Sequence, residues 1–540
     1  MSDSLSIRGA TVYDGSGGPG RTADVAIRHG RIEMVGRMPD RRSSRTYDAT
    51  GLALAPGFID LHSHADFTLP AFPGATNSIS QGVTTEAVGN CGESPAPLSR
   101  DPGLARIRRS EARGMGPDLA WDWGTMAEYL ARLDAARPAV NCVPLVGHAS
   151  LRIAAMGLDD RPARESEVRA MREELHAALG AGAWGLSTGL VYRPGIAAST
   201  REIVEVGEPL RQARGLYASH VRNEGDGVVE AVKEAIEIGR RSGARVQISH
   251  LKAAGTANLG LVRDALAEIE RANLDGLSVN CDVYPYTAMG TYLSQLLPPW
   301  AEVGGAGAIA SRLRSTDVRS RVAIDVRDGL PGWNNYVAAA GGWDRILVAS
   351  VADERLRPMQ GRSLKDLALE SGVDPLRFSL DLLMEDPLGT NVAIFLMAEP
   401  DVDTVITSEF SVIASDQYGV TSDDAYVHPR AWGAFARVLR RAAQGELLDL
   451  PTAIHKMSGL PARIVGLPDR GLVRRGYIAD LVLFDPSKIK DQASYELPNR
   501  PAEGIDAVLI GGRFAIERGK TANIGLGRVI RRSGQFEPAP

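Results

Sequence analysis

The feature that most constrains the fold is a long alternation of short apolar runs and amphipathic segments. The amphipathic segments carry apolar residues at helical spacing, as in residues 172–182, 228–243 and 261–272. Strands that alternate with helices build a parallel sheet, which is either a closed barrel or a doubly wound sheet. The apolar runs that we predict to be strands are residues 139–147, 183–189, 216–221, 244–251, 277–286 and 410–416.

Side chains that can do chemistry follow the predicted strands, and this position favours the barrel. In (β/α)8 barrels the active site gathers at the C-terminal ends of the strands. We therefore predict an α/β protein with a TIM-like (β/α)8 barrel over residues 55–440. The pattern is less regular within about residues 296–410, where we predict a lid or insertion. The side chains concerned are His62, His64, His220, His250, Tyr284 and Asp416.

Short strands with glycine-containing turns occupy both ends of the chain. Residues 1–54 and 460–540 contain runs that alternate apolar and polar residues, as strands with one buried face do. The Gly511-Gly512 pair separates two apolar runs, which is typical of a hairpin. We predict that the two ends together build one small domain, a β-sandwich or β-barrel.

The composition excludes several classes of protein. With 540 residues, of which 44% are hydrophobic and 24% charged, the chain can form one large globular domain and a smaller one. The net charge is -5 and no basic block occurs, so we expect no nucleic-acid partner. No apolar run approaches the roughly 20 residues that span a bilayer, so we expect no membrane contact.

The cellular setting is predicted from the start of the chain and from its cysteines. The first residues lack the basic and apolar regions of a signal peptide. Three cysteines in so long a chain do not make a disulfide framework. We therefore expect a cytoplasmic protein, and the sequence leaves its oligomeric state open.

The stretch GFIDLHSHAD, residues 57–66, places two histidines one residue apart after an apolar run. If residues 57–64 form a strand, His62 and His64 point to the same face. Two imidazoles on one face at a strand end can bind a divalent metal. Two neighbouring surface or core histidines are the alternative, and the pair alone does not decide between them.

Other potential metal ligands also follow strand-like segments. A tetrahedral zinc site uses three protein ligands and one open position. His220 in ASHVRNE and His250 in ISHLKAAG each follow a short apolar run, as does Asp416 in IASDQYG. Cys91 in GNCGES stands beside glycines that let the backbone approach a metal closely. Taken singly, Cys91 fits a small buried hydrophobe and Asp416 fits a turn residue. We assign structural or solvated roles to His29, His176, His455, Cys142 and Cys281.

Two short motifs fail their context tests. GSGGPG, residues 15–20, fits a dinucleotide-binding loop, but a hairpin-like segment follows it where a helix is required. GLSTG, residues 185–189, fits a nucleophile elbow around Ser187, but Pro194 and Gly195 indicate a loop in place of the helix.

The assembled set resembles the metal-dependent amidohydrolase superfamily and, within it, the D-aminoacylase (N-acyl-D-amino-acid deacylase) family. The resemblance covers nearly the whole chain. The HxH pair and ADLVLFDP identify only the superfamily, whereas GNCG, HVRNEGD and HPRAWG are more specific to the deacylases. The segments that carry the resemblance are GFIDLHSHAD (57–66), QGVTTEAVGNCGES (81–94), GLSTGLVYRPG (185–195), YASHVRNEGD (217–226), QISHLKAAG (247–255), DVYPYTA (282–288), ASDQYG (414–419), HPRAWGAFARVL (428–439), SGLPARIVGLPDRG (458–471), ADLVLFDP (479–486) and PAEGIDAVLIGGR (501–513).

The resemblance implies a TIM-like barrel and one tightly bound zinc ion. It implies that Cys91, His220 and His250 hold this ion, with Cys91 in the place of a bridging carboxylated lysine. It also implies that zinc activates a water for attack on an amide, while Asp416 takes the proton and returns it to the leaving amine. A second or weaker metal position is implied at His62, His64 and Asp416.

The resemblance further implies a small N-acyl-D-amino acid as the substrate. Lys252, Tyr284 and Arg430 are candidates to bind its carboxylate, because cationic and hydroxyl groups suit that group. Tyr192 in GLVYRPG is a further candidate for substrate binding. A surface lysine, a packed barrel tyrosine and a structural arginine ion pair are the respective alternatives for the first three.

Three features of the chain bear on the side chain of the substrate. The family often has SDG where this chain has SDQYG, and Gly-Ser-Thr where it has Met289-Gly290-Thr291. Residues 291–303 contain no arginine that could hold an acidic side chain, so we expect neutral or hydrophobic ones. The alternatives are a D-dipeptidase, an N-acyl-D-glutamate deacylase or a hydrolase of a different amide. A non-catalytic assembly protein is disfavoured, because all six implied ligands are present.

Overall fold

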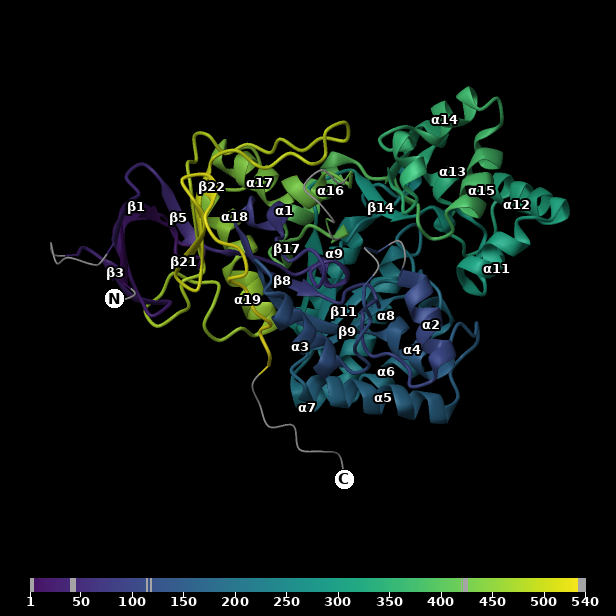
Figure 1. Cartoon of the computed structure of the whole chain (residues 1–540), viewed down its shortest axis with the longest axis horizontal. Coiled ribbons are helices and arrows are strands. Elements are labelled where there is room, and N and C mark those ends of the chain that lie inside the picture. The colour runs from purple at the N-terminus through teal and green to yellow at the C-terminus, as the bar shows by residue number, and fades with distance from the viewer. Residues whose placement is uncertain are drawn as a thin grey trace.

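The computed structural model describes residues 4–38, 45–112, 115–116, 119–418, 420 and 426–532. Its parts lie along one long axis (Figure 1). A sheet built from both ends of the chain stands at one end, and a parallel barrel fills the middle. A helical extension, which includes α12 (Thr316–Asp328) and α14 (Leu364–Glu370), projects at the other end.

Eight strands form the barrel, and every neighbouring pair is parallel. The prediction of a TIM-like barrel is confirmed, and the six strands predicted between residues 139 and 416 all occur, each within its expected range. These strands are buried on both sides, as parallel strands covered by helices are. In spatial order they are β6 (Phe58–Asp60), β8 (Val83–Val88), β9 (Asn141–Gly147), β10 (Gly185–Gly189), β11 (Leu216–His220), β12 (Arg245–Ile248), β13 (Val279–Val283) and β17 (Ser411–Ile413).

The barrel closes beside the two histidines of the HxH pair. The backbone N–H of Asp416 donates to the carbonyl of His62 at 2.8 Å. Strand β7 (Ser63–His64) then pairs in parallel with β18 (Gln417–Tyr418). The chain ends that carry His62, His64 and Asp416 are therefore held side by side.

The expectation of one strand over residues 57–64 is wrong. Strand β6 ends at Asp60, and the next two residues leave the ladder before β7 begins. The physical reason is a local turn, because the Asp60 carboxylate accepts the backbone N–H of His62 at 3.0 Å. The two imidazoles still reach the same place, as their contacts with Asp416 show below.

Helices cover the outside of the barrel with their apolar faces. Helix α8 carries small and branched residues such as Ala231, Val232 and Ala235 on its buried face, and Gly243 ends it with a φ of +72°. The covering helices are α4 (His148–Met156), α5 (Glu165–Gly180), α6 (Thr200–Val206), α7 (Pro209–Ala213), α8 (Val228–Ser242), α9 (Leu261–Leu274), α16 (Glu399–Thr407), α17 (Arg430–Ala443), α18 (Leu450–Met457) and α19 (Gly459–Val465).

Strands from both ends of the chain share one nine-stranded sheet, as predicted for the small domain. The two groups join where β5 pairs with β19 in antiparallel orientation. The expected hairpin at Gly511-Gly512 links β20 to β21. The strands are β1 (Ser4–Val12), β2 (Arg21–Arg28), β3 (Arg31–Gly36), β4 (Arg45–Asp48), β5 (Ala53–Pro56), β19 (Leu481–Phe484), β20 (Ile505–Ile510), β21 (Arg513–Glu517) and β22 (Lys520–Thr521).

The less regular region forms a small sheet and a group of helices with a core of their own. Strand β16 lies between β14 and β15, and both pairings are antiparallel. Leu293, Leu313, Ile346 and Leu364 are among the fully buried members of this second core. The exact domain boundaries stay a prediction. The elements are β14 (Ala288–Tyr292), α10 (Pro299–Glu302), α11 (Gly305–Arg312), α12 (Thr316–Asp328), α13 (Tyr336–Ala340), β15 (Ile346–Ser350), α14 (Leu364–Glu370), α15 (Pro375–Glu385) and β16 (Asn391–Phe395).

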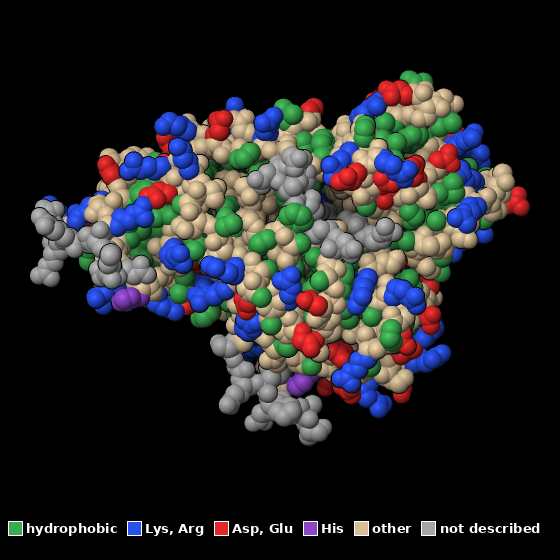
Figure 2. Space-filling model, viewed as in Figure 1, with side chains coloured by type: hydrophobic (Ala, Val, Ile, Leu, Met, Phe, Trp, Pro, Cys, Tyr) green, Lys and Arg blue, Asp and Glu red, His purple; other side chains and the backbone are tan. Residues whose placement is uncertain are grey.

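The surface is mixed in charge. On the face shown in Figure 2, basic and acidic side chains are interspersed over both the barrel and the helical extension. Among the described residues, no helix is both long and apolar enough to cross a membrane.

A buried carboxylate ties the terminal sheet to the barrel, and we expect its removal to destabilise the protein. The Asp480 carboxylate accepts the Arg470 guanidinium at 3.0 Å, the Asn141 amide of β9 at 3.1 Å and the Gly511 backbone N–H at 2.7 Å. Asp480→Ala leaves the Gly511 N–H without its acceptor and leaves buried Arg470 with Asp469, at 3.0 Å, as its remaining carboxylate. We expect this to cost about 1–3 kcal/mol in the free energy of unfolding. Denaturant unfolding followed by tryptophan fluorescence measures this.

The matched control is Asp48→Ala, which removes an exposed carboxylate on β4. We expect this variant to unfold at the wild-type denaturant concentration. If Asp480→Ala also unfolds there, the hydrogen bonds of Asp480 do not hold the sheet on the barrel.

Candidate metal centre

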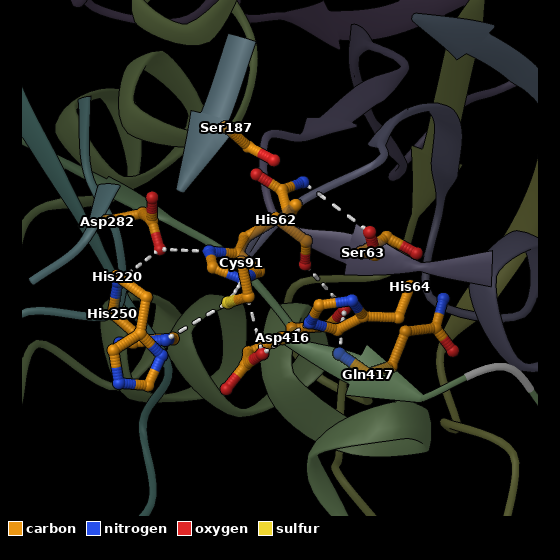
Figure 3. A network of polar contacts seen from close by, with 12 residues as sticks. His62, Ser63, His64, Cys91, Ser187, His220, His250, Asp282, Asp416 and Gln417 are labelled. Carbon is orange, nitrogen blue, oxygen red and sulfur yellow. Dashed lines mark hydrogen bonds and ion pairs between the residues drawn. The ribbon is translucent and has the colours of Figure 1, made fainter. Parts of the chain in front are cut away.

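Four buried side chains meet at the mouth of the barrel (Figure 3). The Sγ atom of Cys91 lies 3.2 Å from His62 Nε2 and 3.5 Å from His250 Nε2. Asp416 Oδ1 lies 3.3 Å from His62 Nε2 and 3.4 Å from His64 Nε2. One donor atom from each of His62, Cys91, His250 and Asp416 falls within 4.8 Å of all the others.

A second group of donors adjoins the first and shares His250. His250 Nδ1 lies 3.1 Å from Glu224 Oε1, and His220 Nε2 lies 3.3 Å from the same oxygen. The His220 and His250 rings stand 4.3 Å apart at 83°. Apart from this contact of Nε2, buried His220 has a second ring nitrogen, Nδ1, that makes no hydrogen bond to a described residue. Buried polar atoms without a hydrogen-bond partner need another partner, and a metal ion would supply one for His220.

Several of these side chains are presented by unusual backbone conformations. Cys91, His250 and Asp416 have φ values of +51°, +35° and +47°, in the left-handed region that L residues avoid. Each such residue costs about 1–3 kcal/mol, and residues of this kind cluster at functional sites. All three follow barrel strands, and their left-handed backbone conformations direct the side chains toward a common point.

The turn that carries Cys91 is held by Ser187 of strand β10. Ser187 Oγ donates to the Gly89 carbonyl at 2.5 Å and accepts the Gly92 backbone N–H at 3.0 Å. Gly92 has a φ of +79°, and a Cβ there would stand 2.7 Å from the Gly189 backbone nitrogen. Ser187, the residue of the rejected nucleophile motif, therefore fixes the position of the cysteine.

Asp282 and Glu224 are buried beside the centre, and sequence reasoning missed them both. Asp282 Oδ1 lies 3.1 Å from His62 Nδ1 and accepts the backbone N–H of His250 at 2.7 Å. A carboxylate on the far nitrogen of a metal-binding imidazole fixes its tautomer and orientation. The available signals were an aspartate inside an apolar strand and a glutamate four residues after His220.

Neighbouring charged groups of the centre favour the ionised forms of Cys91 and Asp416. Burial disfavours an ionised Cys91 thiol, yet the His62 and His250 imidazoles hold its pKa well below the ordinary value. Burial likewise disfavours ionised Asp416, yet the Arg430 guanidinium and the His62 imidazole hold its pKa well below the ordinary value. A thiolate, a carboxylate and imidazoles are the donors that zinc prefers.

Another buried carboxylate network lies beneath the centre. Glu86 accepts the Ser63 hydroxyl at 2.7 Å and the Gln417 amide at 3.1 Å. Asp60 accepts the Ser415 hydroxyl, and burial raises its pKa to about 8. These contacts hold the residues on either side of His62, His64 and Asp416. Gly419, which ends the SDQYG segment, lies outside the described residues.

The four predicted substrate-binding residues lie around the centre and differ in the contacts that they already make. Lys252 Nζ is engaged by Glu224 Oε1 at 2.5 Å and His250 Nδ1 at 2.8 Å. Arg430 Nη1 lies 2.8 Å from Asp416 Oδ2, and its guanidinium stands 4.7 Å from the Tyr284 ring centroid. The Tyr284 hydroxyl is buried and makes no hydrogen bond to a described residue.

Tyr192 and His148 differ in their relation to the centre. The Tyr192 ring lies 4.9 Å from that of His220, and the residue lines the same small cavity as His64, Cys91 and Asp416. His148 also follows a barrel strand, β9, but it lies 3.2 Å from Glu202 in a buried ion-pair group with Arg152. The structure thus brings all six implied ligands together and leaves His148 outside.

The family of the protein follows from comparison with known sequences. The profile of the amidohydrolase family matches residues 45–274 and 321–516, which is most of the chain. The protein belongs to the amidohydrolase family. An N-acyl-D-aspartate deacylase of Alcaligenes xylosoxydans xylosoxydans is 38% identical over 526 residues, which cover 97% of this chain and 94% of that protein. A D-aminoacylase of the same organism is 36% identical and covers 98% of each chain.

Solved structures give the same result for this amidohydrolase. A crystal structure of D-aminoacylase superimposes with a TM-score of 0.81 at 35% identity, covering 98% of this chain and 100% of that one. A second study of D-aminoacylase describes its binuclear metal centre. An N-acyl-D-glutamate deacylase from Bordetella bronchiseptica, in complex with zinc and a phosphonate inhibitor, has a TM-score of 0.80 at 32% identity, with 98% and 99% coverage.

The lowered pKa of Cys91 leads to a spectroscopic prediction for the metal-free protein. An ordinary thiol ionises near about pH 8.5 and is protonated below that value. Because the pKa of Cys91 is lower, we expect its thiolate absorbance in the ultraviolet to persist at pH 7. The measurement is the absorbance difference between wild type and Cys91→Ala across the pH range.

Cys281→Ala is the matched control, because burial raises the pKa of that thiol. We expect this variant to match wild type at pH 7. A Cys91 difference that emerges only as the pH rises past about 8.5 would contradict the charge arrangement described for the centre.

Proposed function

We propose that the protein hydrolyses the amide bond of N-acyl-D-amino acids and releases a carboxylate and a free D-amino acid. The observation that carries the proposal is the meeting of Cys91, His62, His250 and Asp416, with His220 and His64 beside them. Its chemical class is supported by the full-length relatives, which are deacylases of D-aminoacyl substrates.

Zinc is the proposed metal, and Cys91, His220 and His250 would hold the tightly bound ion. His62, His64 and Asp416 would form a second, weaker position, with Cys91 shared between the two. The donor chemistry fits, because a thiolate with imidazoles is typical of zinc, and buried His220 has the 3.3 Å contact of its Nε2 with Glu224 but no hydrogen bond from Nδ1 to a described residue. When bound, zinc polarises the amide carbonyl and lowers the pKa of water.

Asp416 is the proposed general base and acid. Its Oδ2 is fixed by Arg430 and its Oδ1 faces His62 and His64, so the carboxylate is oriented as well as ionised. It accepts a proton from the attacking water and donates it to the leaving amide nitrogen. Arg430 keeps Asp416 ionised until that proton arrives, because a guanidinium favours the charged form of a neighbouring carboxyl.

The substrate's α-carboxylate is the group that Lys252, Tyr284, Arg430 and Tyr192 are proposed to bind. Tyr284 offers a buried hydroxyl that makes no hydrogen bond to the described residues. Lys252 stands 5.9 Å from the Tyr284 ring centroid, and Glu224 holds the lysine in place. Lys252 and Tyr284 therefore face the same small cavity, together with Tyr192 and His220.

A non-acidic side chain is the proposed preference. Gln295 lines the larger cavity next to the centre, and no arginine occurs within residues 291–303. The second candidate function is an N-acyl-D-glutamate deacylase or a related acidic deacylase, which the names of two relatives favour. A D-dipeptidase or a hydrolase of another amide would use the same donors.

Release of free amino acid, measured together with zinc content, tests the proposal. The substrates are N-acetyl-D-methionine, N-acetyl-L-methionine and N-acetyl-D-glutamate, each with and without a chelator. We expect turnover of the D-methionine derivative alone, with activity lost on chelation and restored by zinc. Turnover of the D-glutamate derivative instead would favour the second candidate, and zinc binding without any turnover would contradict the deacylase function.

Asp416→Asn separates the proton transfer from the rest of the site. The amide keeps the shape of the side chain but cannot accept the proton, so we expect kcat to fall by about 10²–10⁴-fold. His455→Asn is the control, since His455 lies in α18 and contacts the Gly15 carbonyl. We expect the control to keep wild-type kcat.

A further inference from the structure

A large cavity extends from the candidate metal centre into the space beside the helical extension. It measures about 860 Å³ with its open mouth included. His64, Cys91 and Tyr192 line it on the side of the centre, while Glu302 and Ile309 line it from the extension. A substrate whose amide lies at the centre would extend its side chain into this cavity.

Part of the cavity wall is apolar. It is formed by side chains from the barrel loops and from the extension, and a straight aliphatic chain would bury apolar surface against them. These residues are Met115, Ile153, Leu158, Ile309 and Leu388.

The charged groups of the cavity are predominantly acidic, and two of the four acids already have cationic partners. Arg193, the arginine among the lining residues, pairs with Asp160 and donates to the Pro299 carbonyl at 3.0 Å. Glu93 pairs with Arg108 at 2.8 Å. The other two acids are Glu111 and Glu302.

Glu302 has hydrogen bonds but no ion pair among the described residues. Its Oε1 accepts the Gln295 amide at 2.8 Å, and Gln295 is itself buried. Burial raises the pKa of Glu302 to about 8, although Arg193 and the hydrogen bonds from Ser294 and Gln295 act in the opposite direction. A carboxyl group with a pKa raised in this way is largely protonated near neutral pH. A cation placed beside it favours the ionised form, which then forms a charge-assisted hydrogen bond.

We propose that Glu302 binds a positive charge at the end of the substrate's side chain, so that the enzyme prefers N-acyl-D-amino acids with basic side chains. The inference rests on the deacylase function proposed above and names its substrate class. The apolar wall takes the aliphatic stem of a lysine-like side chain, and Glu302 takes its terminal ammonium. Neutral hydrophobic side chains use the wall alone, and acidic ones meet a carboxyl group where they would need a cation.

The test compares three substrates of the metal-loaded protein. N-acetyl-D-lysine and N-acetyl-D-norleucine share the straight stem and differ in the terminal ammonium, and N-acetyl-D-glutamate carries the opposite charge. We expect kcat/KM for the lysine derivative to exceed that for the norleucine derivative by about 10- to 100-fold, the worth of a charge-assisted hydrogen bond. We expect the glutamate derivative to be the poorest.

Glu302→Gln keeps the size of the side chain and removes its ability to ionise beside an ammonium group. We expect the lysine-to-norleucine ratio of kcat/KM to fall to near one in this variant. Glu354→Gln is the matched control, because Glu354 lies on the same extension with an exposed side chain and does not line the cavity. The control should keep the wild-type ratio.

The failure of this inference can be told from the failure of the proposed function. A wild-type enzyme that hydrolyses the norleucine derivative as well as the lysine derivative overturns the role of Glu302 and leaves the deacylase function standing. No turnover of any derivative contradicts the deacylase function. In that case calorimetric titration with N-acetyl-D-lysine still decides, because we expect wild type to bind it more tightly than Glu302→Gln, and equal binding overturns the role of Glu302.

Discussion

The candidate metal centre depends on the placement of the Cys91 sulfur among imidazoles. The Cys91 side chain lies in a buried site, and burial alone would raise the pKa of its thiol. The neighbouring His62 and His250 imidazoles lower that pKa instead. The remaining charges follow from this one, since Asp282 orients His62 and Arg430 balances Asp416. A metal ion would take over the positive charge that protonated imidazoles supply in its absence. The donor set of the centre therefore suits a cation.

The barrel holds the donors in place because buried, rigid strands support the strained residues that follow their ends. Strands β8 and β17 are fully buried, and β12 is buried except at Arg245. The segments that follow these strands adopt left-handed conformations at Cys91, His250 and Asp416. Hydrogen bonds from Ser187 and from the Asp416 backbone hold two of these ends in place. Packing of the closed barrel therefore stabilises left-handed backbone conformations that would be unfavourable in an isolated turn.

The sequence predicted the barrel and the six clustered donors because both leave local signals. Apolar residues repeat with different periods in strands and in helices, and a histidine, cysteine or aspartate after an apolar run can be recognised in the sequence itself. Asp282 and Glu224 were missed, since a carboxylate that orients another residue has no spacing rule of its own. The break after Asp60 was missed because one side-chain hydrogen bond decides it. Glu302 becomes informative only when the extension is folded against the barrel mouth.

The most direct test of the central claim is a zinc K-edge X-ray absorption spectrum of the metal-loaded protein. The account predicts one sulfur scatterer at about 2.3 Å together with nitrogen or oxygen scatterers at about 2.0–2.1 Å, and loss of the sulfur contribution in Cys91→Ala. A spectrum fitted by nitrogen and oxygen alone in the wild-type protein would contradict it, because the Cys91 thiolate would then not be a ligand.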